Sequence, residues 1–396
     1  MNFCNKIFLV VYFWLFVFSC VYAQNLVPNP SFETYTACPT ASSQIYYAPP
    51  WTGPTANSTD YFNVCSSIMG VPVAGVGYQY PRTGNAYAGF WGYDAIGSNY
   101  REYLQVQLNN VLLTGKCYYL KFYTNLLNGN SSTYIGAINN IAAHISNISY
   151  TTSSSNGNVL SLIPHALKFG NPILRDTLNW MEISGIYIAT GGEDHIIIGN
   201  FYNDTQTDTS ANFYSSFSGF AYYYIDDVSV IPTDSISMPP HTGNDTTIVL
   251  GDSVFIGQQL YGLHCNWYGN SVLLDTNISG IWVKPTVTTT YVVEQNLCGN
   301  MGYDTVVVNV SPLGINKFKN EGLKIYPNPA KEILIIEWEN KNGGIKIIDV
   351  FGSIIKQQNI VSDKTTINVS DLKEGVYFMQ VQTKQNSYTQ KIIVQH

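Results

Sequence analysis

The sequence predicts an all-β protein of several domains. Its 396 residues exceed the length of one ordinary β-domain and suit two or three domains, each large enough to bury its own core. From Gln24 to about Pro232, short runs of β-branched and aromatic residues alternate with clusters of Gly, Asn, Ser and Pro. Helical spacing of apolar residues is hardly sustained anywhere. We therefore expect many short strands, arranged in sandwiches or barrels.

The composition is typical of the surface of an extracellular protein. Charged residues make up only 11% of the chain, whereas aromatics reach 14% and include 30 tyrosines. The formal net charge of -7 would repel nucleic acid and anionic lipid head groups, because phosphate binding needs clustered Lys and Arg. The balance therefore argues against nucleic acid and against anionic membrane surfaces as partners.

The first 23 residues have the pattern of a secretory signal peptide. Lys6 precedes an apolar run from Ile7 to Phe18, and small residues suited to signal peptidase lead up to Ala23. We expect cleavage before Gln24, because the run is shorter than the roughly 20 residues that span a bilayer. A lipoprotein-like box ending at Cys20 is a weaker alternative. No later stretch approaches spanning length, so we expect no transmembrane helix in the mature chain.

The cysteines favour disulfides over metal sites. After signal removal an odd number would remain in an oxidising compartment, where disulfides persist. No C-x-x-C and no Cys/His cluster at zinc spacing occurs in the sequence. We expect the pairs Cys38–Cys65 and Cys265–Cys298, with one thiol left unpaired, Cys117 being the remaining cysteine.

A proline-punctuated linker from Ile231 to Pro240 separates the first domain, residues 24–232, from a second, residues 239–312. In the second, strand-like runs recur over the length of one small domain. Cys265 lies two residues before Trp267, and Cys298 follows a later strand-like run. This echoes the immunoglobulin pattern of two strand cysteines around a core Trp. A plain sandwich without any binding function is the alternative.

The last domain, residues 322–396, follows a second linker from Pro312 to Glu321. Eleven of the 19 Lys and Arg residues are lysines between Lys317 and Lys391, which marks a boundary in composition. Ile325 to Ala330, Asp349 to Gly352 and Leu372 to Tyr377 occur in that order, and an apolar strand follows Lys391. Together they resemble the C-terminal sorting domain of the type IX secretion system.

That resemblance implies recognition by an outer-membrane translocon in a Gram-negative bacterium, after export to the periplasm. A sortase would then remove the domain, and the protein would be released or held at the cell surface. The residues that would carry the sorting motif are Pro327, Asn328, Pro329, Gly375, Tyr377 and Lys391.

The first domain opens with Asn25 to Glu33 and closes with Tyr224 to Val230. These strings resemble the first and last strands of galactose-binding-like jelly rolls, a class that holds many carbohydrate-binding modules. The resemblance implies a structural calcium ion held by Glu33 and Asp227, with backbone carbonyls. Carboxylate and carbonyl oxygens are ligands that Ca²⁺ prefers, although two strand-end carboxylates are also common as solvated charges.

Binding is the function that the sequence favours, and we expect no enzymatic activity. Trp51, Trp91 and Tyr93 lie among Pro and Gly residues and are suited to stacking on sugar faces. No serine-hydrolase elbow, P-loop, dinucleotide fingerprint or zinc-protease motif occurs. A glycan-degrading hydrolase and a purely structural surface component are the alternatives. The acids a hydrolase would use include Asp60, Asp94, Glu102, Glu182 and Asp194, but the sequence pairs none of them.

Overall fold

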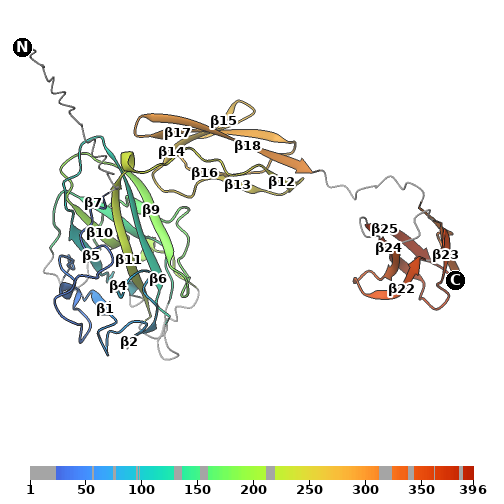
Figure 1. The fold of residues 1–396 in the computed structure, drawn as a ribbon, viewed down its shortest axis with the longest axis horizontal. Helices are drawn as coiled ribbons and strands as arrows, with labels where there is room; N and C mark the ends of the chain where they lie inside the picture. Colours follow the sequence, from blue (N-terminus) through green and yellow to red (C-terminus); the bar gives the residue numbers. More distant parts are fainter. Residues whose placement is uncertain are drawn as a thin grey trace, which may run out of the picture. The chain divides into compact units, whose positions relative to one another are not determined.

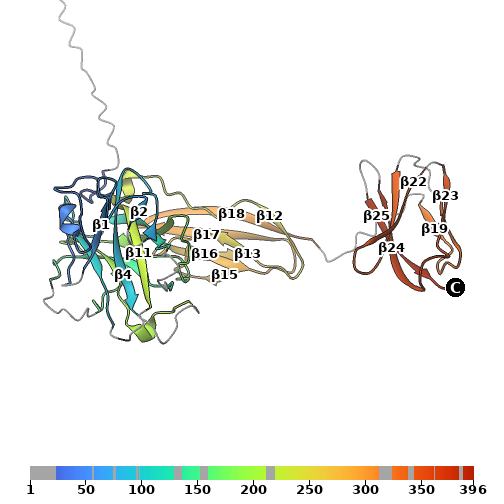
Figure 2. The ribbon, with the colours of Figure 1, turned by 90° about the horizontal axis from the view of Figure 1, so that it is seen from below.

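The computed structural model describes residues 24–55, 58–74, 77–94, 97, 99–128, 136–151, 159–210, 219–311, 323–337, 343–360, 362–382 and 387–396. The predicted signal peptide and the linker from Pro312 to Glu321 lie outside them. The chain divides into two compact units, residues 1–311 and 312–396 (Figures 1 and 2). Strands dominate both, as predicted, and the helical elements are short: η1 (Ile45–Tyr47), η2 (Asp204–Gln206) and η3 (Thr233–Ser235).

The N-terminal domain is a sandwich of two antiparallel sheets. The first has the order β1 (Asp60–Asn63), β4 (Ala86–Asp94), β11 (Phe220–Pro232), β6 (Cys117–Leu126), β9 (Met181–Ile188). The second has the order β5 (Tyr103–Gln107), β10 (His195–Asn200), β7 (Ile141–Ser146), β8 (Ala166–Leu167). Alternate residues of both sheets meet in one core, where Phe122 and Ile225 of the first sheet lie in the same cluster as Ile196 and Ile198 of the second. This is the packing expected when each sheet has one apolar face.

Part of the outer face of the five-stranded sheet is also covered. Phe62, Tyr87, Tyr222 and Tyr224 project from β1, β4 and β11 into a second apolar cluster. Residues next to the hairpin of β2 (Val73–Ala74) and β3 (Gly77–Tyr78) cover this cluster. Strands β6 and β9 lie at the other side of the sheet.

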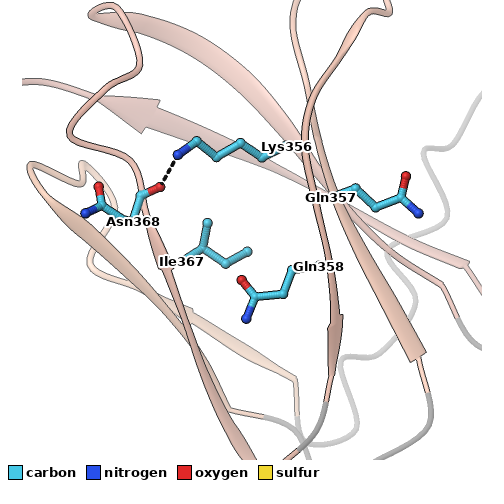
Figure 3. A pocket seen from close by; sticks show the side chains of 5 residues that line it. All are labelled: Lys356, Gln357, Gln358, Ile367 and Asn368. Carbon is cyan, nitrogen blue, oxygen red and sulfur yellow. Dashed lines mark hydrogen bonds between the residues drawn. The ribbon is translucent and has the colours of Figure 1, made fainter.

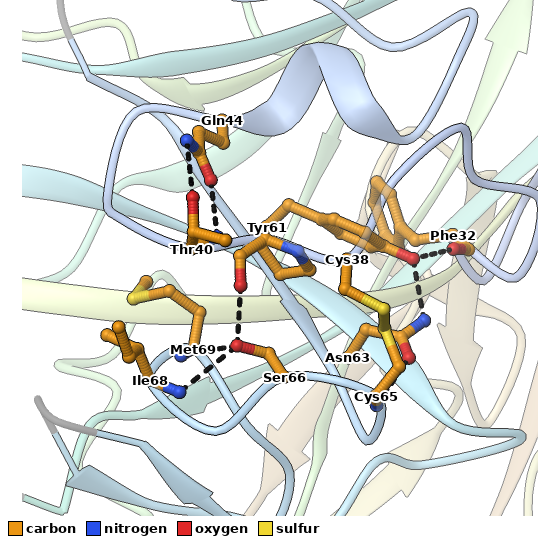
Figure 4. The surroundings of a disulfide bond; sticks show 11 residues. Phe32, Cys38, Thr40, Gln44, Tyr61, Asn63, Cys65, Ser66, Ile68 and Met69 are labelled. Atoms are coloured by element: carbon orange, nitrogen blue, oxygen red, sulfur yellow. Dashed lines mark hydrogen bonds between the residues drawn. A yellow bond between two sulfur atoms is a disulfide. The ribbon is translucent and has the colours of Figure 1, made fainter.

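The Cys38–Cys65 disulfide expected from the sequence is present and ties an N-terminal loop to the end of β1 (Figure 4). Its Cα atoms are 5.7 Å apart, an ordinary spacing for a disulfide. Nearby, the Tyr61 hydroxyl donates to the Phe32 carbonyl at 3.0 Å, and Asn63 donates to the Tyr61 hydroxyl at 2.7 Å. The loop is therefore held by covalent and polar links together.

The central domain is a second sandwich. One sheet has the order β12 (Thr246–Val249), β18 (Asn300–Ser311), β17 (Thr289–Leu297), β14 (His264–Gly269), β15 (Val272–Asp275). The other pairs β13 (Val254–Gly257) with β16 (Gly280–Val283). Trp267 is fully buried between them, and its indole N–H donates to the Ile278 carbonyl at 2.9 Å. The core Trp of the predicted immunoglobulin-like pattern is thus in place.

The central core continues into the N-terminal domain. Cys117 and Ile186, from β6 and β9, belong to the same apolar cluster as Trp267. The Ile186 N–H also donates to the Tyr261 carbonyl at 2.9 Å. The two sandwiches of the first unit therefore share a packed interface.

The predicted Cys265–Cys298 disulfide is wrong: Cys298 pairs with Cys117, and the Cα atoms are 6.0 Å apart. Cys265 is buried as a free thiol. Cys265 lies on β14 two residues from Trp267, so both side chains point into the central core. Cys298 instead lies in the turn between β17 and β18 with φ +54°, where its side chain reaches the neighbouring domain.

The C-terminal domain packs two sheets around Leu334, Ile347 and Met379. One has the order β19 (Lys324–Tyr326), β20 (Ile333–Glu337), β23 (Lys364–Asn368). The other has the order β22 (Ile354–Ile360), β21 (Gly343–Ile348), β24 (Gly375–Gln382), β25 (Ser387–Val394). A polar hollow of about 390 Å³ lies between β22 and β23, where the Lys356 ammonium donates to the Asn368 carbonyl at 2.7 Å (Figure 3).

In the described part of the chain, no helix has both the length and the apolar character needed to cross a bilayer.

Candidate functional site

The outward side of β6 and β9 carries a row of aromatic and charged side chains. Along β6, even-numbered residues such as Phe122 point into the core, whereas Tyr119, Lys121 and Tyr123 alternate with them and are half-buried on the outside. Strand β9 places Glu182 directly opposite Tyr123. We call these four residues, Tyr119, Lys121, Tyr123 and Glu182, the tyrosine face.

Glu182 organises the tyrosine face. It accepts hydrogen bonds from the hydroxyls of Tyr119 at 3.1 Å and Tyr123 at 2.8 Å. Burial opposes its ionisation, but the bonds from Tyr123 and Tyr119 and the charge of Lys121 outweigh burial and hold the pKa of Glu182 below its usual value. Burial and Glu182 together raise the pKa of Tyr123 to about 12. At neutral pH the face therefore presents an ionised carboxylate held by two phenol donors.

Lys121 lies between the two rings. Its ammonium is 5.7 Å from the ring centroid of Tyr119 and 5.6 Å from that of Tyr123, within the range of cation–π attraction. Among the described residues this ammonium makes no hydrogen bond, and its charge acts on the nearby Glu182 carboxylate. The face thus offers donors and acceptors side by side between two aromatic rings.

Two other segments lie at the two ends of the tyrosine face. At one end, the guanidinium carbon of Arg82 lies 3.4 Å from the centroid of the Tyr123 ring. At the other, Tyr119 forms one wall of a groove of about 350 Å³ that Met238, Pro239 and Gln258 also line. The site is therefore built from the N-terminal sheet, the turn containing Arg82 and the junction with the central domain.

The residues predicted to bind calcium lie around the same turn. Glu33 accepts from the backbone N–H groups of Asn85 at 2.7 Å and Ala86 at 3.0 Å. Asp227 accepts from the hydroxyls of Ser31 and Thr83 and forms an ion pair with Arg82.

N–H donors thus occupy one carboxylate oxygen of Glu33, and O–H donors and a guanidinium occupy both oxygens of Asp227. Across the described residues, no group of three or more His, Cys, Asp or Glu side chains is placed to hold a metal ion. Calcium binding by Glu33 and Asp227 stays a prediction.

The predicted aromatic platform is not assembled as one surface. Trp51 is wrong as a stacking residue because it is only 1% exposed, packs on Phe32 and donates its indole N–H to the Asn29 carbonyl at 2.8 Å. Trp91 is half-buried, and one face of its ring stacks on Phe220 at 4.6 Å. Tyr93 is half-buried beneath the Arg101 guanidinium. Ligand contact by Trp91 and Tyr93 stays a prediction.

Two of the five acids named for a hydrolase approach each other, but inside the protein. Asp60 accepts from the Tyr222 hydroxyl at 2.7 Å, and Glu102 accepts from the Trp91 N–H at 2.8 Å and the Tyr100 hydroxyl at 3.0 Å. Both acids are buried, and burial, with a smaller contribution from Asp60, raises the pKa of Glu102 to about 7. This pair lacks the exposure that substrate contact needs.

The other acids have separate surroundings. Glu182 belongs to the tyrosine face, Asp94 is buried at the end of β4, and Asp194 contacts the His195 ring at 2.6 Å. His144 stacks on His165 with ring centroids 4.7 Å apart. Burial lowers the pKa of both histidines, to about 4 for His165.

The buried acid Glu102 predicts a pH dependence of stability. Its pKa is higher in the folded than in the unfolded state, so its contribution is complete below about pH 4 and is lost as the pH rises through 7. We expect the free energy of unfolding to fall by about 3 kcal/mol between pH 5 and pH 8 from this group. Urea unfolding at several pH values measures the fall.

In Glu102→Gln this part of the slope should disappear. Glu182→Gln is the matched control, because the lowered pKa of Glu182 places its titration below this window. An unchanged slope in Glu102→Gln would contradict the assignment.

The predicted sorting residues come together in the C-terminal domain. The Asn328 side chain donates to the Lys391 carbonyl at 2.9 Å and accepts from the Ile393 N–H at 2.8 Å. Pro327 and Pro329 flank it, each after a cis peptide bond. The Tyr377 hydroxyl donates to the Lys373 carbonyl at 2.9 Å, closing the turn in which Gly375 begins β24. The proline loop is thus fastened to the last strand, β25.

Comparison with known families identifies this domain. Residues 324–395 match the family described as secretion system C-terminal sorting domain. No curated protein matches the chain. The match establishes a sorting tail for type IX secretion, which implies a secreted or cell-surface protein.

Solved structures give distant likenesses. PorZ, described as an essential bacterial surface component of the type-IX secretion system of Porphyromonas gingivalis, is 18% identical over 26% of this chain, with a TM-score of 0.19. The matching part spans only 15% of the PorZ chain.

A BSP domain of a biofilm associated protein is 8% identical over 87% of this chain and 66% of its own, with a TM-score of 0.16. A pair of titin Ig tandem domains is 10% identical over 40% of this chain and 98% of its own, with a TM-score of 0.16. These scores are too low to indicate a shared overall fold.

Proposed function

We propose that this exported protein binds a neutral glycan at the tyrosine face and does not hydrolyse it. The observation that carries the proposal is the placement of the Lys121 ammonium and the Glu182 carboxylate between the rings of Tyr119 and Tyr123. Sugar hydroxyls both donate and accept hydrogen bonds, and the apolar faces of sugar rings stack on aromatic side chains. The face supplies charged partners for the hydroxyl groups, with the rings of Tyr119 and Tyr123 beside them.

The charges favour a neutral ligand. Lys121 and Glu182 are opposite in sign and adjacent, and Arg82 is already paired with Asp227, so the site carries little net charge. An anionic ligand would meet Glu182, and a cationic one would meet Lys121. Hydrogen bonds from a neutral hydroxyl to either charged group are stronger than bonds between neutral groups.

The shape favours an extended chain over a single terminal sugar. Tyr119 and Tyr123 are four residues apart on one strand, or about 13 Å. Beyond Tyr119 the surface continues into the groove beside Met238 and Gln258. A polysaccharide segment lying along β6 would therefore contact both tyrosines and enter this groove.

Export would follow the route that the tail implies. The type IX translocon and its sortase are the proposed partners of residues 322–396, and the outer surface of a Gram-negative bacterium is the proposed location. The jelly-roll resemblance of residues 24–232 to carbohydrate-binding modules gives the same indication as the tyrosine face.

A glycan array probed with the purified protein tests the proposal. We expect binding to neutral polysaccharides that changes little between low and high salt, because screening acts mainly on interactions between net charges. In Lys121→Ala the affinity should fall by about tenfold or more, the loss of one charged hydrogen bond. Absence of binding to every glycan, or unchanged binding by Lys121→Ala, would contradict the proposal. Release of reducing ends from the bound glycan would favour the hydrolase alternative.

A further inference from the structure

Three acidic side chains converge on the turn from Pro81 to Ala86. Asp226 accepts from the backbone N–H groups of Arg82 at 2.8 Å and Thr83 at 3.2 Å. Glu33 accepts from the backbone N–H groups of Asn85 and Ala86, and Asp227 accepts from the Thr83 hydroxyl at 2.6 Å. The acids come from the first segment of the domain and from its last strand, β11, so the turn joins the two ends of the sandwich.

The approach is close enough to require a glycine in the turn. Gly84 has φ +63°, and a Cβ atom placed there would lie 2.3 Å from a carboxylate oxygen of Glu33. Asp227 itself has φ +51°, which turns its side chain away from the direction of the strand and toward Arg82. The backbone conformations of Gly84 and Asp227 thus allow the acidic side chains to contact the turn.

A cluster of carboxyl groups is stabilised by a nearby positive charge, and Arg82 supplies one here. The Asp227 carboxylate accepts hydrogen bonds from the hydroxyls of Ser31 and Thr83. The Arg82 guanidinium pairs with Asp227 and lies on the Tyr123 ring.

We propose that Arg82 is the resident cation of this junction: it pairs with Asp227 of the last strand, at the position where a metal ion would otherwise bind. The same side chain positions the Tyr123 ring at the edge of the tyrosine face. Arg82 thereby links the stability of the domain to the geometry of the proposed glycan site, although the assignment itself does not need glycan binding.

Thermal unfolding with added Ca²⁺ or with a chelator tests this assignment, followed in the full chain by near-ultraviolet circular dichroism. The wild-type melting temperature should be the same in both conditions. Arg82→Ala should melt about 5 °C lower in chelator, because it leaves a partly buried carboxylate without its cation. Added Ca²⁺ should recover part of that loss.

The exposed ion pair of Lys116 and Asp234, at 3.0 Å, provides the control. Lys116→Ala should change the melting temperature little and should show no response to Ca²⁺. A wild-type protein stabilised by Ca²⁺ and destabilised by chelator would overturn the proposal, as would an Arg82→Ala protein that melts like the wild type. If Arg82→Ala does not fold, Arg82→Lys decides: a folded variant insensitive to Ca²⁺ supports the assignment, and a Ca²⁺-dependent one contradicts it.

Discussion

Replacing Cys117 and Cys298 together by serine is expected to lower the free energy of unfolding of the first unit by about 3 to 5 kcal/mol. The disulfide joins residues 181 positions apart, and a cross-link restricts the unfolded chain more when it closes a longer loop. It also fastens the central domain to the N-terminal sheet beside Tyr119. We expect the single unfolding transition of this unit in urea to shift to lower concentration and to separate into two.

Thiol labelling supplies the control for this disulfide. In unfolded, unreduced mature protein, an alkylating reagent should modify Cys265 alone, because the other four cysteines are paired. Cys265→Ala should keep the single unfolding transition of the wild type, since it removes a buried thiol without opening either disulfide. Labelling at Cys117 or Cys298 in the unreduced protein would contradict the pairing.

Deleting residues 322–396 is expected to abolish release to the outer surface. The tail matches the sorting domain over residues 324–395, whereas the N-terminal signal predicted for residues 1–23 serves only the inner membrane. The truncated protein should accumulate in the periplasm of its own host, as measured by cell fractionation and immunoblotting. Surface display of the truncated protein at the wild-type level would contradict the assignment.

A point variant gives a matched control for the deletion. Asn328→Ala removes the two hydrogen bonds that fasten the proline loop to β25 but leaves the first unit untouched. If the folded tail is the signal, this variant should be exported less than the wild type while the N-terminal domain keeps its folded spectrum.

Features that depend on residues close together in the chain could be predicted from the sequence. Alternation of apolar and polar residues gave the strands, because successive side chains of a strand point to opposite faces. Three ordered motifs identified the C-terminal domain. Cys38 and Cys65 lie 27 residues apart within one domain, where proximity in the chain favours pairing.

Contacts between segments far apart in the sequence could not be predicted. Cys117 meets Cys298 only because the central domain packs against β6, and nothing near either cysteine indicates this packing. Trp51 was misplaced for a related reason: its Pro-rich neighbours suggest an exposed loop, but its ring is buried and its indole N–H donates to the Asn29 carbonyl.

The tyrosine face was partly visible in the sequence. Tyr119, Lys121 and Tyr123 alternate with Leu120 and Phe122, which already indicates a polar and aromatic outer side of a strand. The sequence did not show that Glu182 lies opposite Tyr123 or that Arg82 covers its ring. Both depend on strand register and turn position across more than 40 residues.

The most direct test of the proposed binding is calorimetric titration of a neutral polysaccharide into the wild-type protein and into Tyr119→Ala/Tyr123→Ala. Tyr303→Ala is the matched control, because Tyr303 is 64% exposed on β18 of the central domain and does not line the groove. We predict saturable binding by the wild type and by Tyr303→Ala, and loss of measurable binding by the double variant. Equal affinities for all three proteins would contradict glycan binding at the tyrosine face.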